Sequence, residues 1–233
     1  MTQEPGQLEM HLSGPSIGIN PRIQNIREQR NLGEYIEFPG VVHGVYTRPN
    51  LLVPFRPNFS AYWEDAHLEL IRLNARMLTP RDFVDFLIML KRGIANNGNG
   101  KPISANALTG LLNSLINSDE FDRELFDARF RTAGAEIIME YSHTMLSGRI
   151  KPRHTITLTK YARGRGKIDL LGVNDLGLPG YHAGDTGIGN QYYFSPLKGK
   201  DTVTTFSCRN RVAELDCRAS REESFLVRAC LLS

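Results

Sequence analysis

The chain has 233 residues, 41% of them hydrophobic, with 28 lysines and arginines against 25 aspartates and glutamates. This length and composition can build one large core, so one domain, or one domain with an arm, is expected. The formal net charge of +3 is small for this size, and nucleic acid is therefore not an expected partner. From Arg149 onward, 14 basic residues against 8 acidic ones leave an excess of six positive charges, which permits an anionic partner without requiring one.

Membrane and secretion signals are missing from the sequence. No stretch approaches the roughly 18 apolar residues of a membrane span. The first residues also lack the basic start and apolar core of a secretion signal. The three cysteines, Cys208, Cys217 and Cys230, are odd in number and lie near the C-terminus. A disulfide framework is therefore not expected, and the predicted location is a reducing one, the cytoplasm or a phage particle.

The N-terminal region predicts an arm followed by one domain. Residues 1–34 are polar, with scattered glycine and proline, and are expected to form an arm or linker that orders against a partner subunit of a homo-oligomer. Residues 35–233 are expected to form a single domain. It opens with short strands over 35–38, 41–46 and 51–55, the first two joined at a Pro-Gly turn.

The best-specified stretch, 60–93, predicts two helices joined by a sharp corner. Ser60 is the expected N-cap of the first helix. The second begins with Thr79 as N-cap, followed by Pro80 and then Asp82, which suits a capping box. Gly93 is its expected C-cap. The buried stripes are expected to be Trp63, Ala66, Leu70 and Leu73 in the first helix and Phe83, Phe86, Leu87 and Leu90 in the second.

The middle of the chain predicts a third helix and three more strands. Ser104 is expected to cap the helix, and leucines from 108 to 115 form its buried face. The acidic stretch 119–122 is expected to be a solvated helix or loop. Paired strands are expected over 126–131 and 136–141, and another over 154–161. His143 and His154 are candidate bases, but no serine or cysteine nucleophile accompanies them, so structural or surface roles are expected.

The glycine-rich segment 171–196 is expected to be an extended, irregular surface path. Asp175, Asp185 and Asn190 on this path are candidate calcium ligands. A hydrogen-bonded turn without metal is the equal alternative, and no other cofactor is expected.

The C-terminal end predicts three strands, over 203–206, 212–217 and 225–232, separated by polar loops. In the second strand, Leu215 and Cys217 alternate with Glu214 and Asp216. One face of that strand is therefore expected to be apolar and the other open to solvent or a ligand.

Two parts of the chain resemble the formylglycine-generating-enzyme branch of the C-type lectin fold. Trp63-Glu64-Asp65-Ala66 and the segment 76–80 are similar to that branch's first helix and the corner after it. The C-terminal segments 213–217 and 224–229 resemble the framework of the variable proteins of diversity-generating retroelements. The resemblance implies an α+β, C-type lectin-like domain with two to three helices, short antiparallel strands and long irregular loops.

The resemblance implies a non-enzymatic protein that binds a ligand or receptor, with a protein or cell-surface molecule as partner. No catalytic residue is then expected. Two alternatives stay open: an oxidoreductase related to formylglycine-generating enzymes, using Cys208 or Cys217, and a phage structural or assembly protein whose arm drives assembly. The predicted binding face consists of Thr204, Phe206, Arg209, Asn210, Arg211, Glu214, Asp216, Arg218, Arg221 and Glu222.

Overall fold

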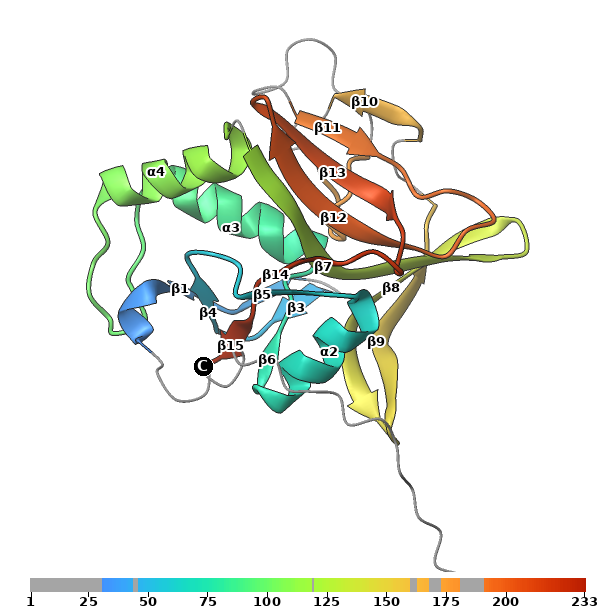
Figure 1. Cartoon of the computed structure of the whole chain (residues 1–233), viewed down its shortest axis with the longest axis horizontal. Helices are drawn as coiled ribbons and strands as arrows, with labels where there is room; N and C mark the ends of the chain where they lie inside the picture. The colour runs from blue at the N-terminus through green and yellow to red at the C-terminus, as the bar shows by residue number, and fades with distance from the viewer. Residues whose placement is uncertain (1–30, 44–45, 119, 160–162, 168–172, 181–190) are drawn as a thin grey trace, which may run out of the picture. The chain divides into compact units, whose positions relative to one another are not determined.

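The computed structural model describes residues 31–43, 46–118, 120–159, 163–167, 173–180 and 191–233, which belong to the compact unit Asn31–Ser233. Of the described residues, 46% lie in strands and 21% in helices. Figure 1 shows how the sheets and helices are arranged. The fold is therefore mostly β, with a nine-stranded sheet and strands of up to 14 residues. The predicted α+β, C-type lectin-like class with short strands is wrong, because the domain is built mainly from long strands paired in large sheets.

A four-stranded sheet has the order β1-β4-β15-β6, so it joins the beginning of the described chain to its end. A separate two-stranded hairpin, β2–β3, divides the stretch that the sequence predicted as one strand over 41–46. The elements are η1 (Leu32–Glu34), β1 (Tyr35–Phe38), β2 (Val41–His43), β3 (Tyr46–Arg48), β4 (Leu51–Pro54), β6 (Ala75–Arg76) and β15 (Cys230–Leu232).

The nine-stranded sheet has the order β10-β11-β13-β12-β7-β14-β5, and β8 pairs with both β7 and β9. The residues 120–122, expected in a solvated helix or loop, begin its longest strand. Its strands are β5 (Phe59–Ala61), β7 (Glu120–Ala133), β8 (Glu136–Leu146), β9 (Arg149–Thr157), β10 (Arg165–Lys167), β11 (Gln191–Phe194), β12 (Thr202–Arg209), β13 (Val212–Ala219) and β14 (Phe225–Val227).

Helix α3 (Pro80–Arg92) matches its prediction at both ends. The Thr79 hydroxyl accepts a bond from the Asp82 N–H, and the Asp82 carboxylate accepts one from the Thr79 N–H, which completes the capping box. Gly93 closes the helix with a φ of 69°, a left-handed conformation that glycine adopts without strain. All four residues of its predicted stripe are buried.

The other two helices, α2 (Trp63–Arg72) and α4 (Ala105–Ile116), differ in how well they were predicted. Ser104 caps α4 as expected. Ser60 does not cap α2, because it lies in β5, where it pairs with Leu226. The helix begins after Tyr62 without a side-chain cap. The predicted apolar stripe of α2 is nevertheless buried throughout.

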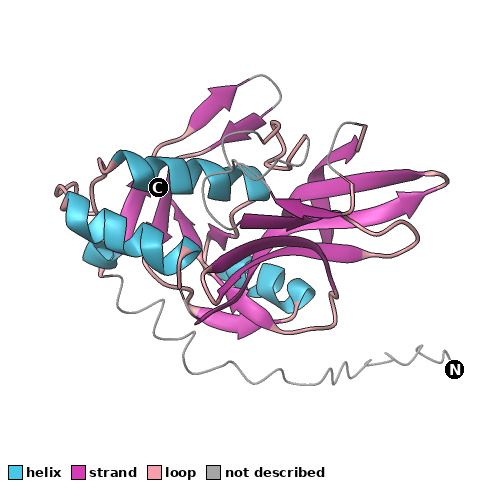
Figure 2. Cartoon of the chain, turned by 90° about the horizontal axis from the view of Figure 1, so that it is seen from above, coloured by secondary structure: helices cyan, strands magenta, loops and turns pink. Residues whose placement is uncertain are grey.

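Helices α3 and α4 lie alongside the nine-stranded sheet (Figures 1 and 2). Aromatic rings lie in the contact between α3 and the sheet. Phe83 of α3 lies with its ring centroid 4.7 Å from that of Phe126 on β7 and 4.6 Å from that of Phe206 on β12. This contact covers the Phe206 face of β12, a strand in which seven of eight residues are buried. Within the described ranges, no helix is long and apolar enough to cross a membrane.

The predicted final strand over 225–232 is two strands that belong to different sheets. Phe225–Val227 pairs with β5, while Cys230–Leu232 pairs with β4 and β6. Arg228 lies between them, fully buried against Glu124 of β7. A charged residue therefore stands at the point where the chain passes from one sheet to the other.

Candidate functional site

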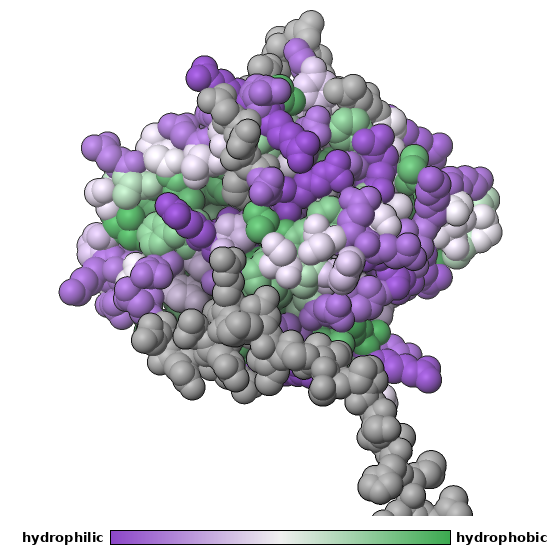
Figure 3. Space-filling model, viewed as in Figure 1, coloured by the Kyte–Doolittle hydropathy of each residue, from purple (hydrophilic) through white to green (hydrophobic). Residues whose placement is uncertain are grey.

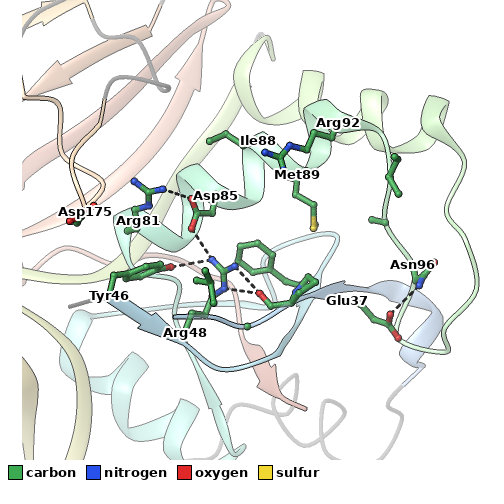
Figure 4. Close-up of a pocket in the computed structure, with 16 residues that line it drawn as sticks. Glu37, Tyr46, Arg48, Arg81, Asp85, Ile88, Met89, Arg92, Asn96 and Asp175 are labelled. Carbon is green, nitrogen blue, oxygen red and sulfur yellow. Dashed lines mark hydrogen bonds and ion pairs between the residues drawn. The ribbon is translucent and has the colours of Figure 1, made fainter. Parts of the chain in front are cut away.

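A groove of about 610 Å³ lies between α3, the β2–β3 hairpin and the chain after α3 (Figure 4). Its lining combines apolar side chains such as Ile88 and Met89 with several charges. The central charges satisfy one another: Arg48 donates to Asp85 at 3.1 Å, and Arg81 donates to the same carboxylate at 2.8 Å. The groove has the size of a small-molecule site, but its internal ion pairs leave no clear preference for one class of ligand.

Behind this groove, Asp82 is the centre of a buried polar network. It accepts hydrogen bonds from the Tyr46 hydroxyl, from Arg76 and from the N-cap Thr79. Burial and the neighbouring Asp82 carboxylate raise the pKa of the Tyr46 phenol, so Tyr46 stays protonated and acts as a donor. Arg76 donates to Asp82, and against the opposing effect of burial, Asp82 and a second buried carboxylate, Asp127, raise the pKa of its guanidinium.

Asp127 lies at the centre of a cluster with His67 and His143, whose ligand atoms all lie within 4.8 Å of one another. His143 Nδ1 is 2.5 Å from Asp127 Oδ1, and His67 Nε2 is 3.6 Å from the same oxygen. Trp63 packs edge-on against both imidazoles, with ring centroids 4.3 and 4.8 Å away. The side chains of the three cluster residues are at most 4% exposed.

The backbone of β8 turns His143 toward Asp127. Ser142 has a φ of 55°, a left-handed conformation that is uncommon for a non-glycine residue and often marks a functional position. The next residue, His143, lies opposite Pro152, which has no N–H. The His143 N–H donates to Asp127 Oδ2 at 2.9 Å. Asp127 therefore holds His143 by both its backbone and its ring.

The charge state of the cluster follows from its burial. Burial lowers the pKa of His67 to about 4, although Asp127 acts in the opposite direction, so His67 is neutral at pH 7. Burial alone would raise the pKa of Asp127, but the two histidines and, less strongly, the Arg76 charge outweigh it and bring the pKa to about 2. The site at neutral pH thus contains a carboxylate beside a neutral imidazole nitrogen.

Polar atoms in this cluster remain unsatisfied. Nε2 of His67, Nε2 of His143 and Nε1 of Trp63 are buried without a hydrogen-bond partner among the described residues. At 3.6 Å, the contact between His67 Nε2 and Asp127 Oδ1 is too long for a hydrogen bond. Unsatisfied buried polar groups of this kind call for an explanation such as a missing ion or water.

A cavity of about 520 Å³ gives access to the cluster. Its lining includes Asp127 and His143 together with Arg76, Arg153 and His154. His154, the other candidate base, is exposed and stacks on Tyr141 with ring centroids 4.9 Å apart. The structure therefore separates the two histidines that the sequence treated alike: only His143 belongs to the buried cluster.

The predicted C-terminal binding face is only partly accessible. Thr204 and Phe206 are buried, so they cannot contact a partner, and the prediction is wrong for these two. The alternation in β13 is confirmed, because Leu215 is buried while Glu214 and Asp216 are partly exposed. Arg209, Asn210, Arg211, Arg218 and Glu222 are exposed, and Arg221 is half-buried in ion pairs with Glu64 and Asp201. Binding by this face stays a prediction.

The calcium candidates do not form a site within the described ranges. Asp175 lies exposed in a turn at the edge of the groove, while Asp185 and Asn190 fall outside the described residues. The three cysteines are buried and unpaired with one another. Burial raises the pKa of the Cys217 and Cys230 thiols, which is the opposite of what a reactive cysteine needs.

Sequence reasoning missed His67 and Asp127. His67 lies four residues after Trp63, on the same face of α2 as the buried Leu70. A histidine on an apolar helix stripe was the available signal. Asp127 gave none, because a single acidic residue in a strand is common and only the sheet register brings it to the two histidines.

No family model, curated protein or solved structure matches this chain.

Proposed function

We propose that the protein binds one divalent transition-metal ion, held by His67, Asp127 and His143. The observation that carries the proposal is the 3.6 Å separation of His67 Nε2 and Asp127 Oδ1, two buried atoms that do not hydrogen-bond. Two ligands about 2.0 Å from a tetrahedral zinc ion lie about 3.3 Å apart. A small movement would let a cation bridge this pair.

The remaining geometry supports the same assignment. His143 Nδ1 offers a second nitrogen, the third ligand atom of the set, beside Asp127, and the ion would replace the proton that they share. Among the described residues, the contacts of Asp127 within ion-pair distance are to the two histidines, and the Arg76 charge acts on it from a longer distance. His67 is neutral at pH 7, the form that binds metal.

The ligand set indicates the class of metal and its use. Two imidazoles and one carboxylate suit zinc, cobalt or iron(II), whereas calcium takes oxygen ligands. Three protein ligands leave a further position for water or substrate, as in catalytic rather than structural zinc sites. The adjoining cavity gives a small molecule access to Asp127 and His143. The centre therefore suits activation of a bound water molecule.

The test is metal binding by the full chain without a histidine tag. Chelator-treated protein is titrated with Zn²⁺ and with Co²⁺, and the bound metal is measured after desalting. We expect one ion per chain and visible cobalt absorption bands typical of four-coordinate geometry. His67→Gln and Asp127→Asn should lose the ion, while the control His154→Gln, which changes a histidine of the same cavity outside the cluster, should keep it.

Folding must be checked by circular dichroism, because Asp127 is buried. If the variants unfold, the cobalt spectrum of the unmodified protein still decides the question. Wild-type protein that binds less than a tenth of an equivalent, or loss of metal in His154→Gln but not in His67→Gln, would refute the proposal. A metal-free acid–base pair of His143 and Asp127 would then be the better account of the cluster.

A further inference from the structure

The ends of β8 and β9 form a two-stranded ribbon beyond the nine-stranded ladder. Residues up to Tyr141 of β8 pair with β7, whereas 143–146 pair, within the described chain, only with 149–152 of β9. The turn contains Ser147 and Gly148, both with positive φ. Figure 1 shows this yellow hairpin reaching away from the sheet, beside α2. We call the segment 143–153 the ribbon.

One face of strand β9 in the ribbon carries a row of positively charged side chains, which we call the charged ladder. Arg149, Lys151 and Arg153 alternate with half-buried residues along β9, and all three are exposed. Side chains two residues apart on a strand lie on the same face, about 6.8 Å from each other. None of the three forms an ion pair with another described residue. The ribbon contains no aspartate or glutamate.

The tip adds a single apolar side chain. Leu146 is 61% exposed and pairs with Arg149, which places it at the end of the charged ladder. Figure 3 shows hydrophilic residues at the lower right of the molecule, where the hairpin ends. A long charged strand with one apolar residue at its tip is a poor membrane anchor, because stable membrane attachment buries a larger apolar area.

We propose that the ribbon binds double-stranded DNA. The three cations would contact successive phosphates, and Leu146 would make an apolar contact with base edges in the major groove. A two-stranded β-ribbon fits the B-DNA major groove, about 12 Å wide, whereas the deep and narrow major groove of duplex RNA excludes it. The regular spacing and the absence of acidic residues favour a linear polyanion over an acidic protein surface. The ribbon begins at the cluster residue His143, but its charged ladder and Leu146 belong to no part of the cluster, so this inference does not depend on a bound metal.

The whole-chain charge concealed this feature. A net charge of +3 gave no reason to expect nucleic acid, because acidic residues elsewhere balance the basic ones. Electrostatic steering of DNA and contact with its phosphates depend on the local arrangement of charge, and the hairpin geometry reveals that arrangement.

The experiment measures binding of the full chain to a fluorescently labelled DNA duplex of about 20 base pairs by anisotropy, from 50 to 200 mM salt. The ribbon variant carries Arg149→Gln, Lys151→Gln and Arg153→Gln. The matched control removes three exposed cations elsewhere: Lys91→Gln, Lys101→Gln and Lys198→Gln. Both variants change the net charge equally, and both should keep the unfolding midpoint because the residues are exposed.

We expect the ribbon variant to bind duplex DNA at least about tenfold more weakly than the control and its log K versus log salt slope to shrink by about two to three, near 0.9 for each lost phosphate contact. Leu146→Ser should weaken duplex binding without changing that slope. Duplex RNA should bind more weakly than duplex DNA.

Several outcomes would overturn the proposal. These are no duplex binding at 50 mM salt, equal affinity in the ribbon and control variants, or tighter binding to single-stranded than to double-stranded DNA. Binding to phosphatidylserine vesicles that the ribbon variant loses, without DNA binding by the wild type, would assign the ribbon to membranes instead.

Discussion

The buried pair of Arg228 and Glu124 permits a quantitative test of how the two sheets are joined. Both side chains are 1% exposed, and two hydrogen bonds of 2.7 and 2.8 Å connect them. Arg228 also donates to the carbonyl of Pro54 at 2.5 Å. Since Pro54 ends β4 in one sheet and Glu124 belongs to β7 in the other, this arginine links both.

Removing one member of the pair leaves the other as an uncompensated buried charge. Glu124→Leu and Arg228→Met should each cost about 3–5 kcal/mol of unfolding free energy. The double variant Glu124→Leu/Arg228→Met removes both charges and leaves mainly the Pro54 carbonyl without a donor. That loss should cost about 1–3 kcal/mol, well below the sum of the single changes.

Urea denaturation followed by circular dichroism measures these differences. With an m-value of about 2 kcal/mol/M, each single variant should lower the midpoint by about 2 M. The double variant should lower it by about 1 M. Single variants that cost less than about 1 kcal/mol, or a double variant that costs the sum of both, would contradict the argument, because either result means that the charges are not coupled in a dry environment.

Three further predictions follow from burial. In metal-free protein, the pKa of His67 near 4 lies below that of a free imidazole, about 6.5, so the unfolded chain takes up the proton first. Stability should be complete above pH 6.5 and fall by about 3 kcal/mol as the pH drops to 4, with a flatter profile in His67→Gln. Phe86→Ala should cost about 3–5 kcal/mol in denaturant titrations, since Phe86 is fully buried; an unchanged midpoint would contradict the placement of α3. Cys217 and Cys230 should resist alkylation at pH 8 in native protein and react fully in urea, as peptide mass mapping would show; rapid native labelling would contradict their burial.

The sequence correctly predicted the features of the fold that contacts between neighbouring residues determine. Helix α3 was correct because Thr79, Asp82 and Gly93 fix its ends through contacts within a few residues. The start of α2 was wrong because Ser60 pairs with Leu226, far along the chain, and this pairing replaces the cap. Local signals cannot report a bond to a distant strand.

The same limit applies to strand boundaries. The sequence predicted a strand from 154, but β9 begins at Arg149. The prediction missed the first half of β9 because that half is mainly polar and contains Pro152. Polar residues do not show the apolar alternation used to recognise a half-buried strand. The segment nonetheless extends because it pairs with β8, and that pairing produces the ribbon.

The metal centre and the ribbon meet at one residue of β8. Up to Tyr141 the strand belongs to the nine-stranded ladder, and from His143 onward it pairs only with β9 among the described residues. Ser142, with its left-handed backbone, stands between the two parts. The change in backbone direction has two effects at once: it brings the His143 N–H to Asp127 and it starts the exposed hairpin. Arg153, across from Ser142 on β9, both ends the charged ladder and lines the cavity that leads to Asp127. A phosphate held by Arg153 would therefore lie beside the cavity that Asp127 and His143, two of the proposed metal ligands, also line.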